Sequence, residues 1–553
     1  MSHPWLSQYP NGMPPEIRDV PNISLGDYFL NACQEHRHKT AFISLGTHLS
    51  FEELNERSTH FAIWLQSAGF KPGSKIALML PNLLQFPIAL LGALRAGCVV
   101  INCSPLYSAR ELETQLIDSE AEAIVILENF AATLQTCIAK TKIRSVITTQ
   151  IGDQLKLPQK WLVNTVVKHI KKSVPAWTLT QHISLNTCIK QGSRGTLQVV
   201  DIRPEDLAFL QYTGGTTGIQ KAAMLSHQNM LANIAQINEC FATRMDDEEQ
   251  LIITALPLYH IFALTVNCFW PMTRGFKNVL IPNARDTKKL IAEMKQYPFT
   301  IFTGVNTLFN ALLLDSDFAQ LDFSTLQISV GGGMAVQRTI AEKWREVTQC
   351  PLSQGYGLTE TSPVVSINPL HLTEFNGSIG LPLPSTIISI RDEDGASLPF
   401  GEVGEICIQG PQVMKGYWNR PAETQAIFHA DGALRTGDLG YMNELGYTTI
   451  VDRKKDMILV AGYNVYPTEI EDVVAAHPSV KEVAAVGVAH PFAGEVVKIF
   501  VVKKDDSLTR QELVAYCRKN LTSYKIPRRI EFRDELPKNN VGKILRRELR
   551  ITT

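Results

Sequence analysis

A glycine- and threonine-rich loop followed by a lysine is the first segment whose residue types could do chemistry. Residues 213–221 read TGGTTGIQK. Glycine lets the backbone approach an anion closely, and neighbouring N–H groups can then form a nest for phosphate oxygens. Threonine hydroxyls add donors, and the lysine adds a positive charge. We therefore predict a phosphate-binding loop, formed by Thr213, Gly214, Gly215, Thr216, Thr217, Gly218 and Lys221.

Two better-known phosphate loops do not fit this segment. A Walker A loop ends in Gly-Lys-Ser/Thr, whereas Lys221 follows Gln220 and precedes Ala222. The dinucleotide pattern GxGxxG is also missing from the segment. A glycine-rich connector without a ligand remains the structural alternative, because glycine loops alone are weak signals.

Four other residues could do chemistry, but each has an ordinary explanation when taken alone. His260 lies among apolar residues, where a core histidine is common. Glu360 suits the start of a helix, and Asp438 in Thr-Gly-Asp suits a turn. Lys543 belongs to a run of cations, GKILRRELR, which is usually solvated. The prediction of a site therefore depends on how these segments combine.

In combination and in order, the segments resemble the acyl-adenylate-forming superfamily, which includes acyl-CoA synthetases and luciferases. Within it, FLQYTGGTTG, TALPLYHIFALT, GVNTLFNALL, GSIGLPLPST and GPQVMKGYW are similar to the long-chain acyl-CoA synthetases of bacteria. The resemblance covers nearly the whole chain. It departs from the usual pattern at Gln220, where proline is usual, at Ala222, where glycine is usual, and at Ala433, where tryptophan is usual.

The resemblance implies a role for each matching position. It implies catalytic roles for Lys543, His260 and Glu360, with Thr213 and Glu360 on the magnesium side. ATP or AMP would be bound by the loop residues above and by Gln354, Gly355, Tyr356, Gly357, Thr359, Asp438 and Arg453. The acyl pocket would include Gly331, Gly332, Gly333 and Met334, the hinge would lie at Lys455, and coenzyme A would pass Gly462 and Tyr463.

The implied reaction has two halves, with Mg²⁺ as cofactor and ATP and coenzyme A as co-substrates. A long-chain fatty carboxylate first attacks the α-phosphate of ATP, which gives acyl-adenylate and pyrophosphate. The thiol of coenzyme A then displaces AMP. Because an anion must meet a polyanion, the first half needs fixed positive charge, which the resemblance assigns to a swinging Lys543.

Hydrophobic patterning indicates the elements that must position these residues. Buried-strand runs such as 75–81 and 121–127 alternate with helical patterns, which predicts an α/β fold of doubly wound layers. From about residue 377, frequent Gly and Pro with short alternating strands predict a β-rich subdomain. We expect an N-terminal domain over 1–452, a hinge over 453–456 and a small mobile α+β lid domain over 457–553.

Composition narrows the class of protein and its surroundings. The 553 residues carry 53 Lys and Arg against 54 Asp and Glu, which argues against a nucleic-acid partner. The ten scattered cysteines form no CxxC pair and indicate a reducing compartment, so we expect a cytoplasmic protein. Residues 250–273 carry no formal charge, but Pro257 and Pro271 favour a buried strand, a loop and a buried helix over a membrane span. A homodimer is left open.

A basic amphipathic pattern covers residues 159–177. Trp161, Leu162, Val166, Val167 and Ile170 share one helical face, while four lysines lie largely elsewhere. Packing of this helix onto the N-terminal domain is the favoured interpretation. Peripheral contact with the inner face of the cytoplasmic membrane is the alternative.

Two other functions are weighed against a long-chain fatty-acid ligase. The first is an adenylate-forming ligase for another carboxylic acid or acceptor, such as an aryl or medium-chain acyl-CoA ligase. The second is a binding or transport component that only senses nucleotide or fatty acid. The full set of catalytic motifs, Lys543 included, argues against the second.

Overall fold

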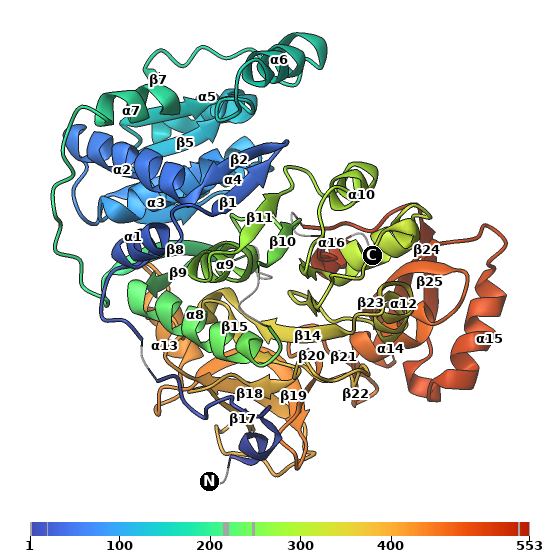
Figure 1. Ribbon diagram of the computed structural model, residues 1–553. Helices are drawn as coiled ribbons and strands as arrows, with labels where there is room; N and C mark the ends of the chain where they lie inside the picture. Colours follow the sequence, from blue (N-terminus) through green and yellow to red (C-terminus); the bar gives the residue numbers. More distant parts are fainter. Residues whose placement is uncertain are drawn as a thin grey trace.

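The computed structural model describes residues 3–18, 20–213, 220–245, 249–490, 492–539 and 542–551. Within these residues four β-sheets are present, and helices cover the two large sheets (Figure 1). This arrangement matches the predicted α/β fold. Loop residues 214–219, which include the predicted Gly214, Gly215, Thr216, Thr217 and Gly218, lie outside the described residues.

The first sheet has the order β7-β6-β5-β3-β4-β8-β9 in the described chain. Its strands are β3 (Lys75–Met79), β4 (Val99–Asn102), β5 (Ala123–Leu127), β6 (Ser145–Thr149), β7 (His182–Ser184), β8 (Leu207–Thr213) and β9 (Lys221–Ser226). Strands β3 to β7 pair in parallel, whereas β8 and β9 pair antiparallel. The predicted strands at 75–81 and 121–127 are confirmed as β3 and β5.

The second sheet has the order β16-β15-β14-β13-β12-β10-β11-β1-β2 in the described chain. Its strands are β1 (Thr40–Ser44), β2 (Thr47–Ser50), β10 (Leu251–Thr254), β11 (Lys277–Leu280), β12 (Ile301–Gly304), β13 (Ile328–Gly331), β14 (Leu352–Gly357), β15 (Val364–Ile367) and β16 (Leu381–Pro382). Strands β10 to β14 pair in parallel. Their carboxyl ends therefore share one edge, where α/β proteins place their ligands.

Two smaller sheets follow in the chain. The first contains β17 (Ile387–Arg391), β18 (Gly404–Gln409), β19 (Leu434–Met442) and β20 (Thr448–Arg453). The second contains β21 (Ile458–Val460), β22 (Tyr463–Val465), β23 (Val480–His490), β24 (Gly494–Lys503) and β25 (Arg529–Arg533). We refer to this second sheet and its helices, drawn in orange to red in Figure 1, as the C-terminal domain.

Helices of the described chain begin at residues that favour helix starts. Ser50, Ser108 and Ser226 each accept a backbone N–H at the start of α2, α4 and α8, in capping boxes. The α-helices are α1 (Leu25–Glu35), α2 (Phe51–Ser67), α3 (Gln85–Arg95), α4 (Ala109–Ser119), α5 (Ala131–Cys137), α6 (Gln159–Thr165), α7 (Leu185–Gly192), α8 (His227–Ala242), α9 (Trp270–Thr273), α10 (Thr287–Met294), α11 (Asn306–Leu313), α12 (Arg338–Thr348), α13 (Pro421–Ile427), α14 (Pro467–Ala475), α15 (Arg510–Asn520) and α16 (Arg546–Ile551). Short 3₁₀ or π segments are η1 (Pro4–Gln8), η2 (Glu128–Phe130), η3 (Ile138–Lys140), η4 (Val166–Ile170), η5 (Ala263–Phe269), η6 (Phe318–Gln320), η7 (Thr359–Thr361) and η8 (Ser523–Lys525).

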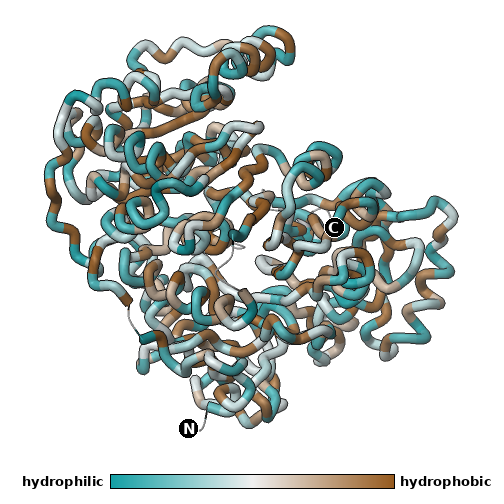
Figure 2. The backbone as a smooth tube through the Cα atoms, viewed as in Figure 1, coloured by the Kyte–Doolittle hydropathy of each residue, from teal (hydrophilic) through white to brown (hydrophobic). Residues whose placement is uncertain are grey.

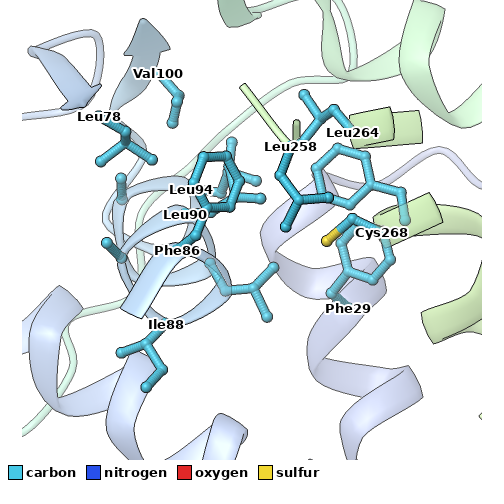
Figure 3. Close-up of a cluster of buried hydrophobic side chains, with 14 of the residues drawn as sticks. Phe29, Leu78, Phe86, Ile88, Leu90, Leu94, Val100, Leu258, Leu264 and Cys268 are labelled. Atoms are coloured by element: carbon cyan, nitrogen blue, oxygen red, sulfur yellow. The ribbon is translucent and has the colours of Figure 1, made fainter. Parts of the chain in front are cut away.

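The largest apolar core packs the first sheet against strands β1, β2 and β11 at one side of the second sheet. Phe29 of α1 meets Leu264 and Cys268 of η5, and these pack with Phe86 and Leu90 of α3 (Figure 3). Burial of such side chains contributes roughly 1.5–3 kcal/mol each. The core therefore fixes the two large sheets relative to one another.

The uncharged stretch 250–273 folds as the sequence predicts, into strand β10, a loop and the buried segments η5 and α9. Asn267 of η5 donates to Thr254 and accepts from Thr303, so its amide is satisfied internally. None of the helices in the described parts of the chain has the length and apolar character needed to cross a membrane.

The basic segment at 159–177 differs from its expected packing. It forms α6 and then the π-helix η4, which ends at Ile170. Trp161, Leu162 and Ile170 are 69%, 57% and 71% exposed, so the prediction that this face packs onto the N-terminal domain is wrong for them. Apolar and polar residues alternate along this segment at the top of the view in Figure 2.

Candidate active site

The ends of the phosphate-binding loop are held by a β-hairpin. Thr213 ends β8 and Lys221 begins β9, and the two residues are directly opposite one another in the antiparallel register. The hairpin therefore brings the predicted Thr213 and Lys221 together. Residues 214–219 of the loop between them lie outside the part of the chain that the structure describes.

Lys221 is linked to Glu360 through a tyrosine that sequence reasoning missed. The Lys221 ammonium lies 5.2 Å from the centre of the Tyr417 ring, within cation–π range. The Tyr417 hydroxyl donates to Glu360 Oε1 at 2.6 Å. Burial, and then the Glu360 carboxylate, raise the pKa of Tyr417 above its usual value, so the phenol keeps its proton. Tyr417 lies within GPQVMKGYW, which supported the resemblance but was assigned no role.

Backbone pairing holds Tyr417 in this place. The Met224 N–H donates to the Gly416 carbonyl at 2.9 Å, and the Trp418 N–H donates to the Ala222 carbonyl at 2.9 Å. The segment around Tyr417 is thus an added strand-like edge beside β9. The Met414 N–H also donates to the Glu360 carbonyl at 2.8 Å, which ties the same segment to η7, where Thr359 precedes Glu360.

A second group joins Tyr356, Asp438 and Arg453, three of the predicted nucleotide-binding residues. The Tyr356 hydroxyl donates to Asp438 Oδ2 at 2.6 Å, and Arg453 Nε lies 3.1 Å from Asp438 Oδ1. Asp438 and Arg453 face each other across β19 and β20. Burial, and then Asp438, raise the pKa of Tyr356, while Asp438 raises the pKa of Arg453. The Asp438 carboxylate therefore lies between two donors, the Tyr356 hydroxyl and the Arg453 guanidinium.

The glycines beside Tyr356 have different reasons to be glycine. A Cβ at Gly357 would lie 2.0 Å from the Pro363 carbonyl oxygen, so backbone packing requires glycine there. A Cβ at Gly355 would meet only ordinary van der Waals contacts.

Buried Gln354 accepts the Val336 N–H through its side chain at 3.3 Å. This amide thereby links β14 to the turn that follows β13.

That turn holds the predicted acyl-pocket residues, with Gly331 at the end of β13. Gly332 lies against Phe262, because a Cβ there would be 3.1 Å from the Phe262 ring. Gly333 has φ of +74° and is followed by Met334, which packs against the main core. The turn thus lies beside Phe262, two residues after His260.

His260 is a neutral imidazole in this setting. Burial, and then the positive charge of Lys543, lower its pKa to about 4. The Phe262 N–H donates to Nδ1 at 3.4 Å, which assigns the proton of the neutral ring to Nε2. His260 can therefore donate a hydrogen bond from Nε2 without being protonated first.

Lys543 lies at the tip of the C-terminal domain, and this tip is docked on the N-terminal domain. The Lys543 carbonyl accepts the Asn539 N–H at 2.8 Å, and its own N–H donates to Asn539 Oδ1 at 2.8 Å. The Thr307 hydroxyl, on α11, donates to the carbonyl of Gly542 at 3.2 Å. Gly542 has φ of +84°, a conformation that favours glycine.

The charges around Lys543 place it with the Asp438–Arg453 pair. Repulsion by the Arg453 charge, and then burial, lower the pKa of Lys543, whereas attraction to Asp438 raises it. The pKa of Lys543 is therefore about 7. Lys543 also acts on His260, as described above. The structure therefore brings Lys543, His260, Asp438 and Arg453 into one electrostatic neighbourhood, although they are far apart in the sequence.

The predicted hinge and coenzyme A residues lie outside this neighbourhood or at its margin. Lys455 follows β20, and burial and then Arg453 lower its pKa to about 8. Gly462, with φ of +85°, forms the turn between β21 and β22. Tyr463 stacks on Tyr524 with ring centres 4.7 Å apart and is 58% exposed. With the C-terminal domain in this orientation, Tyr463 faces solvent.

Comparisons with known proteins agree over the whole chain. The description "AMP-binding enzyme" matches residues 29–418, and "AMP-binding enzyme C-terminal domain" matches residues 469–543. The chain is 54% identical over 551 residues to a long-chain-fatty-acid–CoA ligase of Escherichia coli O6:H1, covering 100% of this chain and 98% of the relative. It is 49% identical over 549 residues to the ligase of the same name from Haemophilus influenzae, covering 99% and 98%.

A solved structure supports the same grouping. ATP-bound MatB from Rhodopseudomonas palustris superimposes with a TM-score of 0.83 at 28% identity, covering 96% of this chain and 99% of that one. The sequence matches, this common fold and the convergence of the motif residues lead to one conclusion: the chain belongs to the family of AMP-binding enzymes.

Proposed function

We propose that the protein is an AMP-forming ligase that joins long-chain fatty acids to coenzyme A. The fatty carboxylate attacks the α-phosphate of ATP, forming an acyl–phosphate bond and expelling pyrophosphate. The thiol of coenzyme A then attacks the acyl carbon and expels AMP. Full-length relatives at 54% and 49% identity carry the name of this activity.

The observation that carries the proposal is the position of Lys543. Its ammonium comes from the C-terminal domain and interacts electrostatically with Asp438 of the N-terminal domain and Arg453 of the hinge. In our proposal Asp438 accepts the ribose hydroxyls of the nucleotide, and Lys543 stabilises the charge that develops when carboxylate and phosphate meet. Docking of Gly542 on Thr307 holds the lysine tip in place for this step.

The residues near the phosphate loop fit a magnesium ion. Glu360 offers a carboxylate and Thr213 a hydroxyl, and such hard oxygen ligands suit Mg²⁺ when substrate phosphates complete its shell. A bound ion would neutralise part of the phosphate charge. The Tyr417 hydroxyl fixes one oxygen of Glu360, which orients the carboxylate for this role.

His260 and the glycine turn would handle the acid substrate. A neutral His260 can donate from Nε2 to the fatty carboxylate without adding a second full charge beside Lys543. Gly331, Gly332, Gly333 and Met334 would border the acyl chain next to Phe262. For the second half-reaction, rotation about Lys455 would turn Gly462 and Tyr463 from solvent toward the pantetheine arm of coenzyme A.

Rate measurements over a series of acids test the substrate class. AMP release with ATP and coenzyme A should be fastest for long-chain fatty acids and slow for medium-chain and aryl acids. A preference for an aryl acid would favour the alternative ligase. AMP release with none of these acids would favour a component that only binds its ligands.

Separate measurement of the two halves tests the role of Lys543. Lys543→Ala should lower ATP–pyrophosphate exchange by about 10²–10³-fold, as for loss of one charge-stabilising donor. Transfer of a supplied acyl-adenylate to coenzyme A should be largely spared. Equal loss in both halves would contradict the assignment.

We place the enzyme in the cytoplasm, with α6 and η4 directed toward the inner face of the membrane. The ten cysteines are all buried free thiols, as a reducing compartment permits. The exposed apolar side chains of Leu157, Trp161, Leu162 and Ile170 lie next to exposed Lys168, Lys171 and Lys172. This composition fits an anionic lipid surface, the source of the acyl substrate.

A further inference from the structure

A buried carboxylate lies on the N-terminal side of the hinge. Asp452 belongs to β20 and pairs with Leu439 of β19, so its backbone is part of the four-stranded sheet. Its side chain is only 1% exposed. A buried carboxylate needs partners, because an unpaired charge in this environment is costly.

Two of its partners come from the other side of the hinge. The Thr468 N–H, in the first turn of α14, donates to Asp452 Oδ2 at 2.8 Å. Arg546 Nη1, at the start of α16, donates to Asp452 Oδ1 at 3.3 Å. Both bonds connect the C-terminal domain to β20 across residues 453–456.

Arg546 is itself held by carboxylates of the C-terminal domain and of the hinge. Its Nε and Nη2 donate to the two oxygens of Glu471 at 3.0 and 2.5 Å. Nη1 also donates to Asp456 Oδ2 at 3.3 Å. Glu471 in turn accepts the Ala485 N–H at 2.8 Å. Arg546 therefore meets Asp452 as a fixed group, three residues after Lys543.

We propose that Asp452, the Thr468 N–H and Arg546 form an interdomain clasp that holds Lys543 in its adenylation position. The clasp opens when the C-terminal domain rotates about the hinge for the second half-reaction. This inference rests on the proposed two-step function. Asp452 and Arg546 are positioning residues, because they act on the reaction through the placement of Lys543.

Geometry explains why the clasp must open. Asp452 precedes the hinge, whereas Thr468 and Arg546 follow it, so any large rotation at Lys455 moves both donors away from the carboxylate. The closed orientation gains these hydrogen bonds but must desolvate the carboxylate, whereas the open orientation breaks them and rehydrates it. The strength of the clasp therefore biases the balance between the two orientations.

The sharpest test removes one donor and no charge. Thr468→Pro eliminates the amide N–H at the second residue of α14, a donor that has no intrahelical partner because it lies in the first turn of the helix. Thr468→Ala is the matched control, since it loses the hydroxyl but keeps the N–H. We expect Thr468→Pro to lower the maximal rate of ATP–pyrophosphate exchange on the order of tenfold relative to Thr468→Ala.

Thioester formation from supplied acyl-adenylate should be unchanged or faster in Thr468→Pro, and the KM for ATP in exchange should change little. Asp452→Asn should likewise lower ATP–pyrophosphate exchange while sparing thioester formation from supplied acyl-adenylate. Glu469→Gln should not separate the two half-reactions in this way. Glu469 is also on α14, but its ion pair with Lys525 (2.7 Å) stays within the C-terminal domain.

Three results would overturn the clasp. These are equal exchange rates in the Thr468→Pro and Thr468→Ala proteins, equal losses in both half-reactions, and the same split in Glu469→Gln. If the proposed function fails, exchange is absent from the unsubstituted protein as well, so that failure is distinguishable from failure of the clasp. If Asp452→Asn does not fold, as thermal unfolding would reveal, the Thr468 pair still decides the question.

Discussion

At the scale of single residues, the site depends on charges whose effect is set by their neighbours. Lys543 is one of several cations in its segment, and its pKa is set by Arg453, burial and Asp438. Glu360 is oriented by Tyr417, which also lies under Lys221. The chemistry of each side chain therefore follows from what surrounds it in the fold.

The pH dependence of adenylation should report Lys543. Arg453 and burial lower its pKa to about 7, so the free enzyme loses this cation as the pH rises through about 7. ATP and the carboxylate are anions, and their binding should raise the pKa again. We expect the alkaline fall in kcat/KM, which reports the free enzyme, to begin at lower pH than the fall in kcat.

The pH prediction has a direct control. In the Lys543→Arg variant the arginine keeps its positive charge throughout this pH range. The alkaline fall in the rate of adenylation should therefore shift to higher pH or disappear, even if the rate itself is lower. An unchanged limb in Lys543→Arg would assign the titration to another group.

Tyr417→Phe should weaken the use of magnesium. The variant keeps the ring beneath Lys221 but removes the 2.6 Å hydrogen bond to Glu360, a bond to a charged group that is typically worth about 1.5–3 kcal/mol. The Mg²⁺ concentration for half-maximal exchange should rise, and exchange should fall roughly tenfold. Normal Mg²⁺ dependence in this variant would show that Tyr417 only packs against its neighbours.

At the scale of elements, hairpins and helix starts place the functional groups. The β8–β9 hairpin sets Thr213 opposite Lys221, and the β19–β20 pair sets Asp438 opposite Arg453. The glycine turn after β13 and the aromatic end of β14 lie on adjacent, parallel strands of the second sheet. The α6–η4 segment is different, because it exposes its apolar side chains.

Charge reversal should weaken binding of the α6–η4 segment to anionic vesicles. A Lys171→Glu/Lys172→Glu variant should float less with phosphatidylglycerol vesicles, because attraction to anionic lipid is lost. Lys168 is left unchanged because its ammonium lies 3.7 Å from Glu128 and pairs within the protein. Flotation with phosphatidylcholine vesicles should depend instead on Trp161 and Leu162.

A matched pair of substitutions elsewhere controls for net charge. Lys343 on α12 and Lys504 just after β24 are exposed, so Lys343→Glu/Lys504→Glu changes the charge equally without touching α6 or η4. If both double variants lose flotation to the same extent, binding depends on net charge and not on this segment.

At the scale of the whole molecule, the placement of one domain on the other completes the site. The tip at Gly542 contacts Thr307 of α11, and Asn310 of the same helix donates to the Lys481 carbonyl at 3.4 Å. Residues 235 and 171 positions apart in the sequence are thereby brought together. The site therefore responds to changes in domain docking as well as to changes in its own side chains.

Gly542→Ala should impair adenylation through docking. Its φ of +84° would cost roughly 1–2 kcal/mol for alanine, and the new Cβ would lie 2.8 Å from Thr307 Oγ1. Gly432→Ala is the control, because φ is +82° there but a Cβ would meet nothing within 4 Å. Both variants should lose similar thermal stability, and only Gly542→Ala should lose ATP–pyrophosphate exchange. Equal exchange in the two would show that docking at Thr307 is dispensable.

The sequence by itself determined the order of the local elements and most of the candidate site. Period-two and helical patterns, serine caps and glycine turns are local signals, so β3, β5, α4 and α8 could be predicted from neighbouring residues alone. The resemblance of the motifs to those of a family identified Lys543, Asp438, Arg453 and Glu360 as candidates.

Only the tertiary structure decided which candidate residues come into contact and which charged groups surround each of them. Tyr417 reaches Glu360, and Arg546 reaches Asp452, through contacts between residues 57 and 94 positions apart. The exposure of Trp161 and Leu162 likewise depends on which surfaces remain uncovered once the sheets have packed. Such contacts arise from the packing of distant segments, so they cannot be predicted from local sequence patterns.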